Sequence, residues 1–261
     1  MKIIAIIPAR MNSSRFPGKP MKKIHGIPMI GHCFLRTRMT PELLDTYVAT
    51  CDVEIYDYIE SIGGKAIMTS NSHERASDRA AEAMLKIESL IGDKVDIVVM
   101  VQGDEPMVTP DMISQSIEPI KEDLSISVVN LMAYMKKSIE FEDPNEVKVV
   151  INNNSEAIYF SREPIPSRSK YEGDIPMLKQ VCVIPFRREY LLHFNEMEET
   201  TLEKIESVDM MRIIENGDKV KMVLTNAESL SVDTEKDLMD VQEKMTKDNI
   251  MEKYSHYIDK V

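Results

Sequence analysis

Short apolar runs alternate with longer amphipathic runs along the chain, and this alternation restricts the fold more than any other feature. Residues 3–8 (IIAIIP) form a continuous apolar run, the pattern of a strand buried on both faces. The same reading predicts further strands at 46–50, 65–68 and 96–101, and helices at 28–38, 53–62, 77–90 and 110–118. Strands that alternate with helices indicate an α/β fold with a mostly parallel sheet.

The pattern changes in the second half of the chain. After a strand predicted at 125–131, the stretch 145–186 (EVKVVI, AIYF and KQVCVIPF) is β-rich, with Asn- and Pro-containing turns. Helices predicted at 187–195, 207–216 and 234–246, with a strand at 220–224, return to the α/β pattern. We therefore expect one domain over residues 1–247 with a β-rich insert, followed by a polar, peripheral tail over residues 248–261.

Composition excludes several classes of protein. The 261 residues include 32 Lys plus Arg and 44 Asp plus Glu, a net charge of −12, which argues against a nucleic-acid partner. Three cysteines are too few for a disulfide framework or a zinc cluster. The sequence contains no apolar run of about 18 residues, so we expect no membrane segment and a cytoplasmic location.

A loop rich in cations follows the first predicted strand. Arg10, Arg15 and Lys19 lie within ten residues, among Ser, Asn, Gly and Pro. Ligands of open α/β sheets bind at the carboxyl ends of the strands, and Arg and Lys are suited to phosphate oxygens. The spacing matches neither a Walker A loop nor a GxGxxG fingerprint. The loop is therefore a candidate triphosphate site, with an ordinary solvated basic loop as the alternative.

Two aspartates occupy comparable positions elsewhere. Asp104 follows the strand predicted at 96–101 within VQGDEP, and Asp233 follows the strand region at 220–224 within SVDT. Mg²⁺ prefers one or two carboxylates together with phosphate oxygens and water. The pair is a candidate metal site. The alternatives are a simple Gly-Asp turn for Asp104 and a helix-terminal acid for Asp233.

The motifs taken together resemble the 3-deoxy-manno-octulosonate cytidylyltransferases, also called CMP-Kdo synthetases. The resemblance rests on the opening IIPAR-x-x-S-x-R-x-PGKP with G-x-PMI, and on VAT, GG, MT, DRAAEA, VQGDEPM, NEVKVV, YFSR and VDT, in family order over residues 1 to about 245. It implies a single-domain Rossmann-like nucleotidyltransferase that forms a homodimer. The implied reaction joins CTP to a 2-keto-3-deoxy sugar acid, requires Mg²⁺, releases pyrophosphate and supplies lipopolysaccharide biosynthesis.

The resemblance also implies roles for individual residues. Catalytic phosphate contacts fall on Arg10, Arg15 and Lys19, and the Mg²⁺ carboxylates on Asp104 and Asp233. The remaining nucleotide-binding positions are Pro8, Ala9, Ser13, Met68, Thr69, Asp78 and Arg79. The positions implied for the sugar acid are Gln102, Arg162, Gln180, Glu206 and Asp209.

This chain departs from the family pattern in two regions. Where the family has H-x-SGTDR, residues 73–79 read HERASDR. In the sugar region, the usual His, Gly and Tyr are replaced by Gln180, Cys182 and Pro185, and a Glu-Gln pair by Asp209 and Met210. Sites built for particular hydroxyls discriminate strongly between substrates, so the acceptor is open.

Three kinds of function therefore remain in view. The first is a Kdo-using cytidylyltransferase in which these departures are neutral. The second uses another anionic acceptor, such as an amino-Kdo or a nonulosonate, or another nucleotide. The third is a protein that binds nucleotide or sugar without catalysis.

Overall fold

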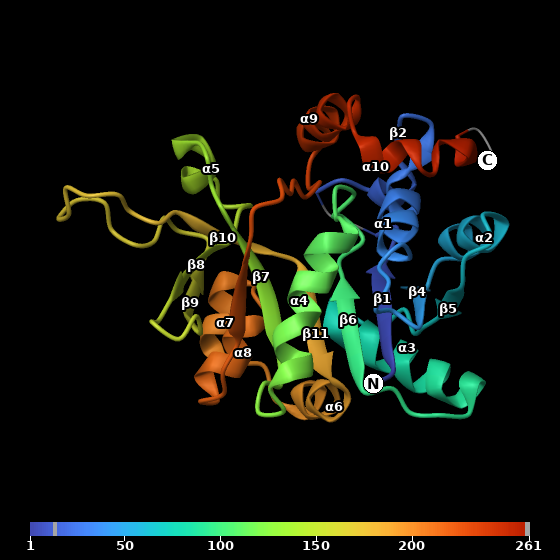
Figure 1. The fold of residues 1–261 in the computed structure, drawn as a ribbon, viewed down its shortest axis with the longest axis horizontal. Coiled ribbons are helices and arrows are strands. Elements are labelled where there is room, and N and C mark those ends of the chain that lie inside the picture. The colour runs from blue at the N-terminus through green and yellow to red at the C-terminus, as the bar shows by residue number, and fades with distance from the viewer. Residues whose placement is uncertain (13–14, 259–261) are drawn as a thin grey trace. The chain divides into compact units, whose positions relative to one another are not determined.

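The computed structural model describes residues 1–12 and 15–258, and Figure 1 shows its helices and strands. The chain divides into two compact units, one of residues 1–114 and 228–261 and one of residues 115–227. The predicted α/β class with a parallel sheet and a β-rich insert is confirmed. The predicted boundary between a domain and a tail at residue 247 stays a prediction.

The first unit is built on a parallel sheet in the order β6-β1-β4-β5. Its strands are β1 (Ile3–Ala9), β4 (Asp45–Thr50), β5 (Ala66–Met68) and β6 (Ile97–Val101). Every residue of β1 and β6 is buried, as the unbroken apolar runs predict. The carboxyl ends of these parallel strands, and the loops that follow them, therefore share one edge.

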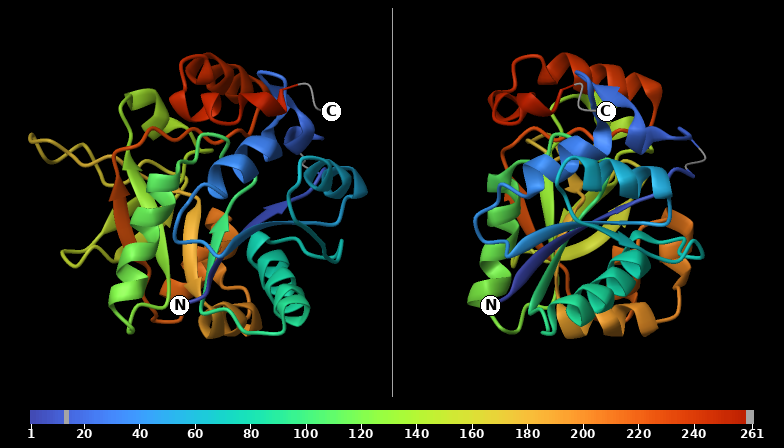
Figure 2. Two further views of the ribbon diagram at one scale, coloured as in Figure 1. Left: turned by 45° about the vertical axis from the view of Figure 1, so that its right-hand side comes forward. Right: turned by 90° about the vertical axis from the view of Figure 1, so that its right-hand side faces the viewer.

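Helices pack against this sheet, as Figure 2 shows from two directions. They are α1 (Met29–Thr37), α2 (Val53–Ser61) and α3 (Ala76–Ile91). Between β1 and α1 lie the short elements η1 (Lys19–Met21), β2 (Lys23–Ile24) and β3 (Ile27–Pro28). The predicted boundaries of the helices and strands of this unit agree with the structure to within one or two residues.

The second unit contains a mixed sheet in the order β12-β7-β10-β8-β9. Its strands are β7 (Val129–Tyr134), β8 (Lys148–Ile151), β9 (Ala157–Ser161), β10 (Leu178–Val181) and β12 (Lys221–Thr225). β12 runs parallel to β7 and the other neighbours are antiparallel. The remaining elements are β11 (Val183–Arg187), α5 (Ser138–Glu142), α6 (Arg188–Glu196), α7 (Thr201–Glu206) and α8 (Met210–Glu215).

Several expectations differ from the structure in detail. α4 (Pro110–Glu122) continues past its predicted end and contains Pro119. The strand expected at 125–131 begins four residues later as β7, and the run KQVCVIPF breaks at Cys182 into β10 and β11. The sequence reading also missed α7, which comes before the predicted helix at 207–216.

The C-terminal segment, expected to be peripheral, contributes a buried residue to the first unit. Its described part, residues 248–258, contains α10 (Asn249–Glu252) and η2 (Ser255–Tyr257). The helix before it, α9 (Glu235–Met245), is the one predicted at 234–246, and both lie beside β2 and α1 (Figures 1 and 2). Tyr254 is only 3% exposed, and its hydroxyl lies 2.8 Å from Nδ1 of His32 and 2.9 Å from Nε of Arg36. The segment is therefore fastened to α1.

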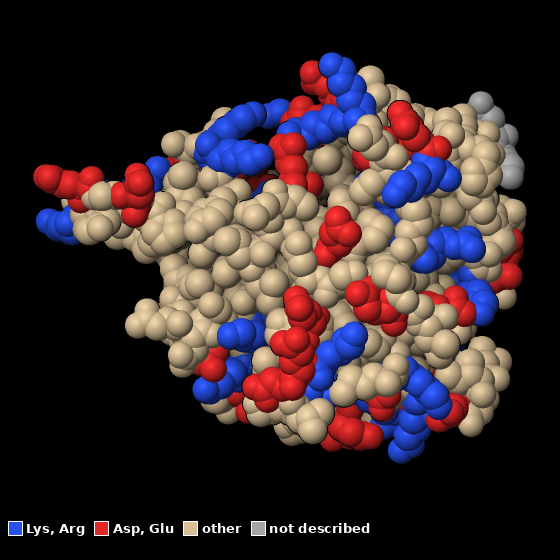
Figure 3. Space-filling view, viewed as in Figure 1, with Lys and Arg blue, Asp and Glu red and all other residues tan. Residues whose placement is uncertain are grey.

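Lys and Arg side chains are interspersed with Asp and Glu on the face drawn in Figure 3. Mixed charge of this kind differs from the basic stripe of a duplex-binding protein. Within residues 1–12 and 15–258, the helices are all too short or too polar to span a bilayer.

Candidate active site

The loop after β1 is closed by a hydrogen bond between its two ends. The backbone N–H of Gly18 donates to the carbonyl of Met11 at 3.0 Å. Gly18 has φ +71°, the left-handed conformation that glycine adopts readily, and η1 begins with the next residue, Lys19. The closure places Arg10 immediately before the loop and Lys19 immediately after it.

The loop after β6 lies directly against the end of β1. A Cβ at Gly103 would meet the carbonyl oxygen of Pro8 in β1 at 2.9 Å and Cδ1 of Ile30 in α1 at 3.2 Å, so a larger residue would push this loop away from both elements. Asp104 follows, and its carbonyl accepts a hydrogen bond from the N–H of Val232 at 2.9 Å. That backbone contact brings Asp233 beside Asp104, although the two residues are distant in the chain.

Lys19 joins the two aspartates. Its Nζ lies 2.8 Å from Oδ2 of Asp104 and 3.1 Å from Oδ1 of Asp233, and it also donates to the carbonyl of Val232 at 2.8 Å. Arg15 approaches the same Asp233 oxygen, with Nη2 at 2.9 Å. The structure thus brings together four of the residues that the sequence singled out.

The charges at this cluster stabilise one another. Only 13% of the Lys19 side chain is exposed. Burial alone would lower the pKa of Lys19, but the adjacent carboxylates of Asp104 and Asp233 outweigh it and raise that pKa above its usual value. Lys19 is therefore a fixed positive charge at neutral pH.

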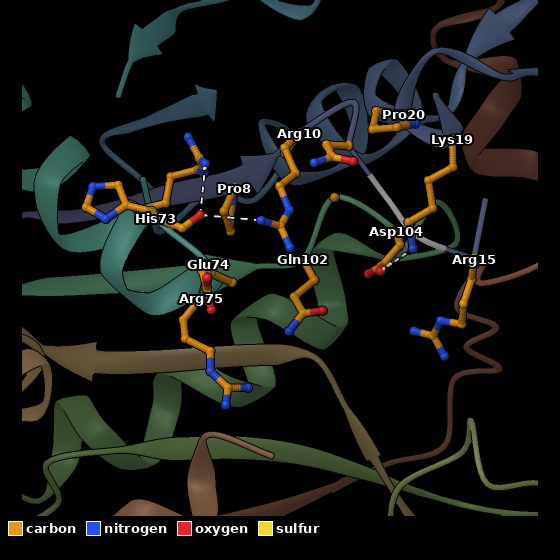
Figure 4. Close-up of a pocket in the computed structure, with 15 residues that line it drawn as sticks. Pro8, Arg10, Arg15, Lys19, Pro20, His73, Glu74, Arg75, Gln102 and Asp104 are labelled. Atoms are coloured by element: carbon orange, nitrogen blue, oxygen red, sulfur yellow. Dashed lines mark hydrogen bonds and ion pairs between the residues drawn. The ribbon is translucent and has the colours of Figure 1, made fainter. Parts of the chain in front are cut away.

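A pocket opens next to this cluster and is drawn in Figure 4. Its lining combines backbone from the end of β1, the cations of the following loop and the acid of the β6 loop. The lining residues are Pro8, Ala9, Arg10, Asn12, Arg15, Lys19, Pro20, His73, Glu74, Arg75, Ala76, Arg79, Gln102, Gly103 and Asp104. Five Arg or Lys side chains against two carboxylates make the pocket suited to a polyanion.

The opposite side of the pocket is organised around the carbonyl of His73. Nη1 of Arg10 and Nη2 of Arg79 each lie 3.4 Å from this oxygen (Figure 4). Arg79 is 2% exposed and also donates to the hydroxyl of Thr69 and the carbonyl of Ser70. Thr69 therefore holds an arginine of the pocket and is not itself part of the lining.

The other predicted nucleotide positions have different placements. Asp78 lies in the first turn of α3, and Met68, at the end of β5, is 38% exposed. Neither lines the pocket as described. Ser13 lies outside the described residues. Sequence reasoning left Glu74 and Arg75 out of the site, although the departure from the family motif at 73–79 had marked this segment.

A small apolar cluster lies behind these loops. Val232, next to Asp233, packs with Ile24, Met29, Val241 and Met245. Phe16 of the cationic loop, Met107 beyond Asp104 and Met251 of α10 pack against the same cluster. The cluster thus supports the segments that carry Lys19, Asp104 and Asp233.

The residues expected to contact the sugar acid, apart from Gln102, belong to the second unit. Glu206 accepts hydrogen bonds from Tyr159 and Ser161, each at 3.0 Å, and from the backbone N–H of Arg162 at 2.8 Å. Arg162 in turn donates from Nε to the carbonyl of Glu206 at 2.7 Å. Glu206 and Arg162 are therefore partners, and Glu206 holds the end of β9.

Gln180 and Asp209 lie elsewhere in that unit. Nε2 of Gln180 donates to Oδ1 of Asn130 at 2.6 Å, and the Asn130 amide donates to the carbonyls of Leu131 and Val181. These contacts fix the orientation of the Gln180 amide on β10. Asp209 is the residue before α8.

Comparison with known proteins gives consistent matches. Residues 4–228 match the model of the family described as Cytidylyltransferase. The 3-deoxy-manno-octulosonate cytidylyltransferase of Geobacter metallireducens is 40% identical, over 95% of this chain and 99% of the relative. That of Geotalea daltonii is 41% identical, over 94% and 98%.

A solved structure matches over a similar extent. The structure of CMP:2-keto-3-deoxy-manno-octonic acid synthetase complexed with CTP has a TM-score of 0.86 and 35% identity, over 95% of this chain and 99% of that chain. Sequence, fold and the cationic pocket thus agree. The chain belongs to the 3-deoxy-manno-octulosonate cytidylyltransferases, within the cytidylyltransferase family.

Proposed function

We propose that this protein transfers CMP from CTP to 3-deoxy-manno-octulosonate and releases pyrophosphate. The observation that carries the proposal is the convergence of Asp104 and Asp233 on Lys19 beside a pocket lined by Arg10 and Arg15. Such an arrangement provides fixed cations for a triphosphate and carboxylates for a divalent ion at one edge of the sheet. The curated relatives carry the name of this reaction.

The reaction makes one bond to phosphorus and breaks one. The anomeric hydroxyl of the sugar acid attacks the α-phosphorus of CTP, its proton passes to solvent, and the bond to the β-phosphate oxygen breaks so that pyrophosphate leaves. This chemistry asks the protein mainly for positioning and charge neutralisation. Arg10, Arg15 and Lys19 are proposed to hold the phosphates. Pro8, Ala9, Ser13, Met68, Thr69, Asp78 and Arg79 are proposed to hold or orient the nucleotide.

The carboxylates of Asp104 and Asp233 are proposed to hold Mg²⁺. The oxygens of these two carboxylates and of the Val232 carbonyl all face the Nζ atom of Lys19, and this convergence of oxygen donors supports the proposal. Mg²⁺ is bound through one or two carboxylates when substrate phosphates complete its coordination. When bound, the ion would neutralise phosphate charge and stabilise the leaving pyrophosphate.

The acceptor is proposed to contact Gln102, Arg162, Gln180, Glu206 and Asp209. One observation keeps a second acceptor in view. The side chain of Gln180 presents an amide fixed by Asn130, where the family pattern has an imidazole. A rigid amide offers a hydrogen-bond donor and an acceptor in fixed places, so it reads a different pattern of hydroxyl or amino groups.

Measurement of pyrophosphate release tests the proposal. The purified protein is assayed with CTP, Mg²⁺ and Kdo, beside an amino-Kdo, a nonulosonate, and UTP, GTP and ATP in place of CTP. Preferred turnover of CTP with Kdo supports the proposal. Turnover with another acid alone reassigns the acceptor. CTP binding without pyrophosphate release from any acid indicates a non-catalytic binding protein.

We also propose a homodimer that acts in the cytoplasm and supplies an activated sugar acid for lipopolysaccharide. Equilibrium sedimentation at assay concentration checks the oligomeric state. A monomer with full turnover would remove the dimer from the proposal.

A further inference from the structure

Asp52 and Met11 are brought together by the register of the sheet. β1 and β4 are parallel neighbours, and Ala9 pairs with Thr50 at their carboxyl ends. Met11 lies two residues after the end of β1, and Asp52 lies two residues after the end of β4. The backbone N–H of Met11 donates to Oδ2 of Asp52 at 2.8 Å. The contact thus joins the cationic loop to the neighbouring strand end.

Asp52 does not use its carboxylate in the way its position in the chain suggests. It precedes α2, where an aspartate ordinarily caps the helix with its side chain. Its side chain makes no cap hydrogen bond to α2 and accepts instead from the loop after β1. The carboxylate of Asp52 thus binds a distant loop and leaves the adjacent helix uncapped, which indicates a role in that loop.

The backbone of Asp52 is itself well held. Its N–H donates to the hydroxyl of Thr50 at 3.1 Å, and its carbonyl accepts the N–H of Tyr56, in the first turn of α2, at 3.1 Å. Thr50 is fully buried at the end of β4. The carboxylate therefore projects from a rigid base onto Met11.

Met11 is fastened at both of its backbone groups. Its N–H is held by Asp52, and its carbonyl accepts the N–H of Gly18 that closes the loop. We call Met11, with its two backbone hydrogen bonds, the anchor of the loop. Arg10 directly precedes Met11 in the chain, and Lys19 directly follows Gly18. One carboxylate thus fixes the base from which two pocket cations project.

We propose that Asp52 is a positioning residue: its hydrogen bond to Met11 sets the loop that places Arg10 and Lys19 on the triphosphate. The inference rests on the proposed function, since it concerns the binding of CTP. Asp52 does not line the pocket, so its effect passes through the loop.

Three variants test the proposal. Asp52→Ser keeps a residue favoured before a helix but is too short to reach Met11. Asp52→Asn removes the charge and keeps an oxygen that accepts the Met11 N–H. Asp57→Ser removes an exposed carboxylate from the same helix and is the matched control. We expect D52S to lose kcat/KM for CTP by about 10- to 100-fold, from the typical strength of a hydrogen bond to a charged group.

The control variants separate positioning from stability. We expect D52N to recover most of the loss, D57S to match the wild type, and the KM for Kdo at saturating CTP to change little in each. Unchanged kcat/KM in D52S, with only a lowered Tm, would overturn the proposal. Equal losses in D52S and D52N would also overturn it, because the acceptor oxygen would then be irrelevant.

Hydrogen exchange in the absence of CTP distinguishes this inference from the proposed function. The Met11 amide should exchange faster in D52S than in D52N or wild type, whatever the substrate. Equal exchange rates of the Met11 amide in all three proteins would show that the Asp52 side chain does not hold Met11, and would overturn the proposal. A wild-type protein without pyrophosphate release, but with the expected exchange pattern, overturns the proposed function and leaves the anchor standing.

Discussion

Lys19 and Asp104 are 85 residues apart in the chain, and Nζ of the first lies 2.8 Å from Oδ2 of the second. The ion pair joins the loop after β1 to the loop after β6. It exists because the parallel strands deliver both loops to the same edge of the sheet. The predictions below concern this pair first and then the framework around it.

Asp104→Asn should reduce kcat by at least about 100-fold, because it removes a negative charge from the proposed Mg²⁺ site while keeping the shape of the side chain. Titration of Mg²⁺ in the pyrophosphate assay checks this. Asp111→Asn, an exposed aspartate in the first turn of α4, is the control and should retain full activity. Wild-type turnover in D104N at ordinary Mg²⁺ would remove Asp104 from the metal site.

Lys19→Met should lower kcat/KM for CTP by about 10- to 1,000-fold, since it removes a partly buried, fixed cation that faces the proposed phosphate site. It also removes an attraction to the triphosphate that salt screens, so the ionic-strength dependence of CTP binding should weaken. Steady-state kinetics at two salt concentrations measures both effects. Lys22→Met alters an exposed lysine just beyond η1 and is the comparison. Identical kinetics in the two variants would indicate that the cationic loop is an ordinary solvated loop that does not bind the triphosphate.

The free energy of unfolding should fall as the pH drops from about 6.5 to about 4. Burial is the main cause that lowers the pKa of His32 to about 4 in the folded protein, and the charge of Arg36 adds to it. The unfolded chain therefore takes up the proton first, and the contribution, on the order of 3 kcal/mol, is present above this window and lost within it.

The hydrogen bonds of His32 explain why its imidazole does not readily take up a second proton. Nε2 lies 2.9 Å from the carbonyl of Ile24 and must donate to it, so Nδ1 accepts from the Tyr254 hydroxyl. Urea unfolding of wild type, His32→Gln and His256→Gln across this pH range checks the prediction. H32Q should flatten the dependence, and H256Q, at an exposed histidine, should not. Parallel curves for all three would assign the pH dependence to other groups.

Glu203→Gln should destabilise the protein by about 3–5 kcal/mol, because it leaves the buried guanidinium of Arg212 without its carboxylate. Arg212 makes two contacts to Glu203, at 2.8 and 2.6 Å, and Glu203 is fully buried. Thermal unfolding measures the loss. Lys204→Gln, which removes an exposed and longer ion pair with Glu199 at 3.9 Å, should cost less than about 1 kcal/mol. Equal changes in Tm would contradict the assignment.

The strands and helices of the first unit could be predicted because they are locally determined. β1 is an unbroken apolar run, and α9 is capped by Thr234, which accepts from the N–H of Asp237 as the sequence spacing suggests. The cationic loop and Asp104 could be placed at one edge by the rule for parallel strands. The approach of Asp233 to Asp104 and Lys19 depends on the backbone hydrogen bond between Val232 and Asp104. This contact joins distant parts of the chain, so no local sequence pattern predicts it.

The differences between the predicted and the observed elements have identifiable physical causes. β7 starts late because Asp123 accepts from the N–H and hydroxyl of Ser125 and forms a turn there. α7 was signalled by Thr200 and Glu203, whose carboxylate accepts the Thr200 N–H, but the short helix was overlooked. The tail seemed polar from its composition. The single tyrosine that is buried within it has no sequence signature.

The unit that bears the pocket is assembled from residues 1–114 and 228–261, with residues 115–227 between them. During synthesis, Arg10, Lys19 and Asp104 leave the ribosome long before Asp233, Val241 and Tyr254 do. Until the last segment is made, the cationic loop therefore lacks Asp233, one of its two carboxylate partners. The apolar cluster that supports the loop is also incomplete, because Val241 is not yet present. The order of translation thus makes the nucleotide pocket one of the last parts of the molecule to mature, and an unfinished chain would carry its cations with Asp104 but without Asp233 to neutralise them.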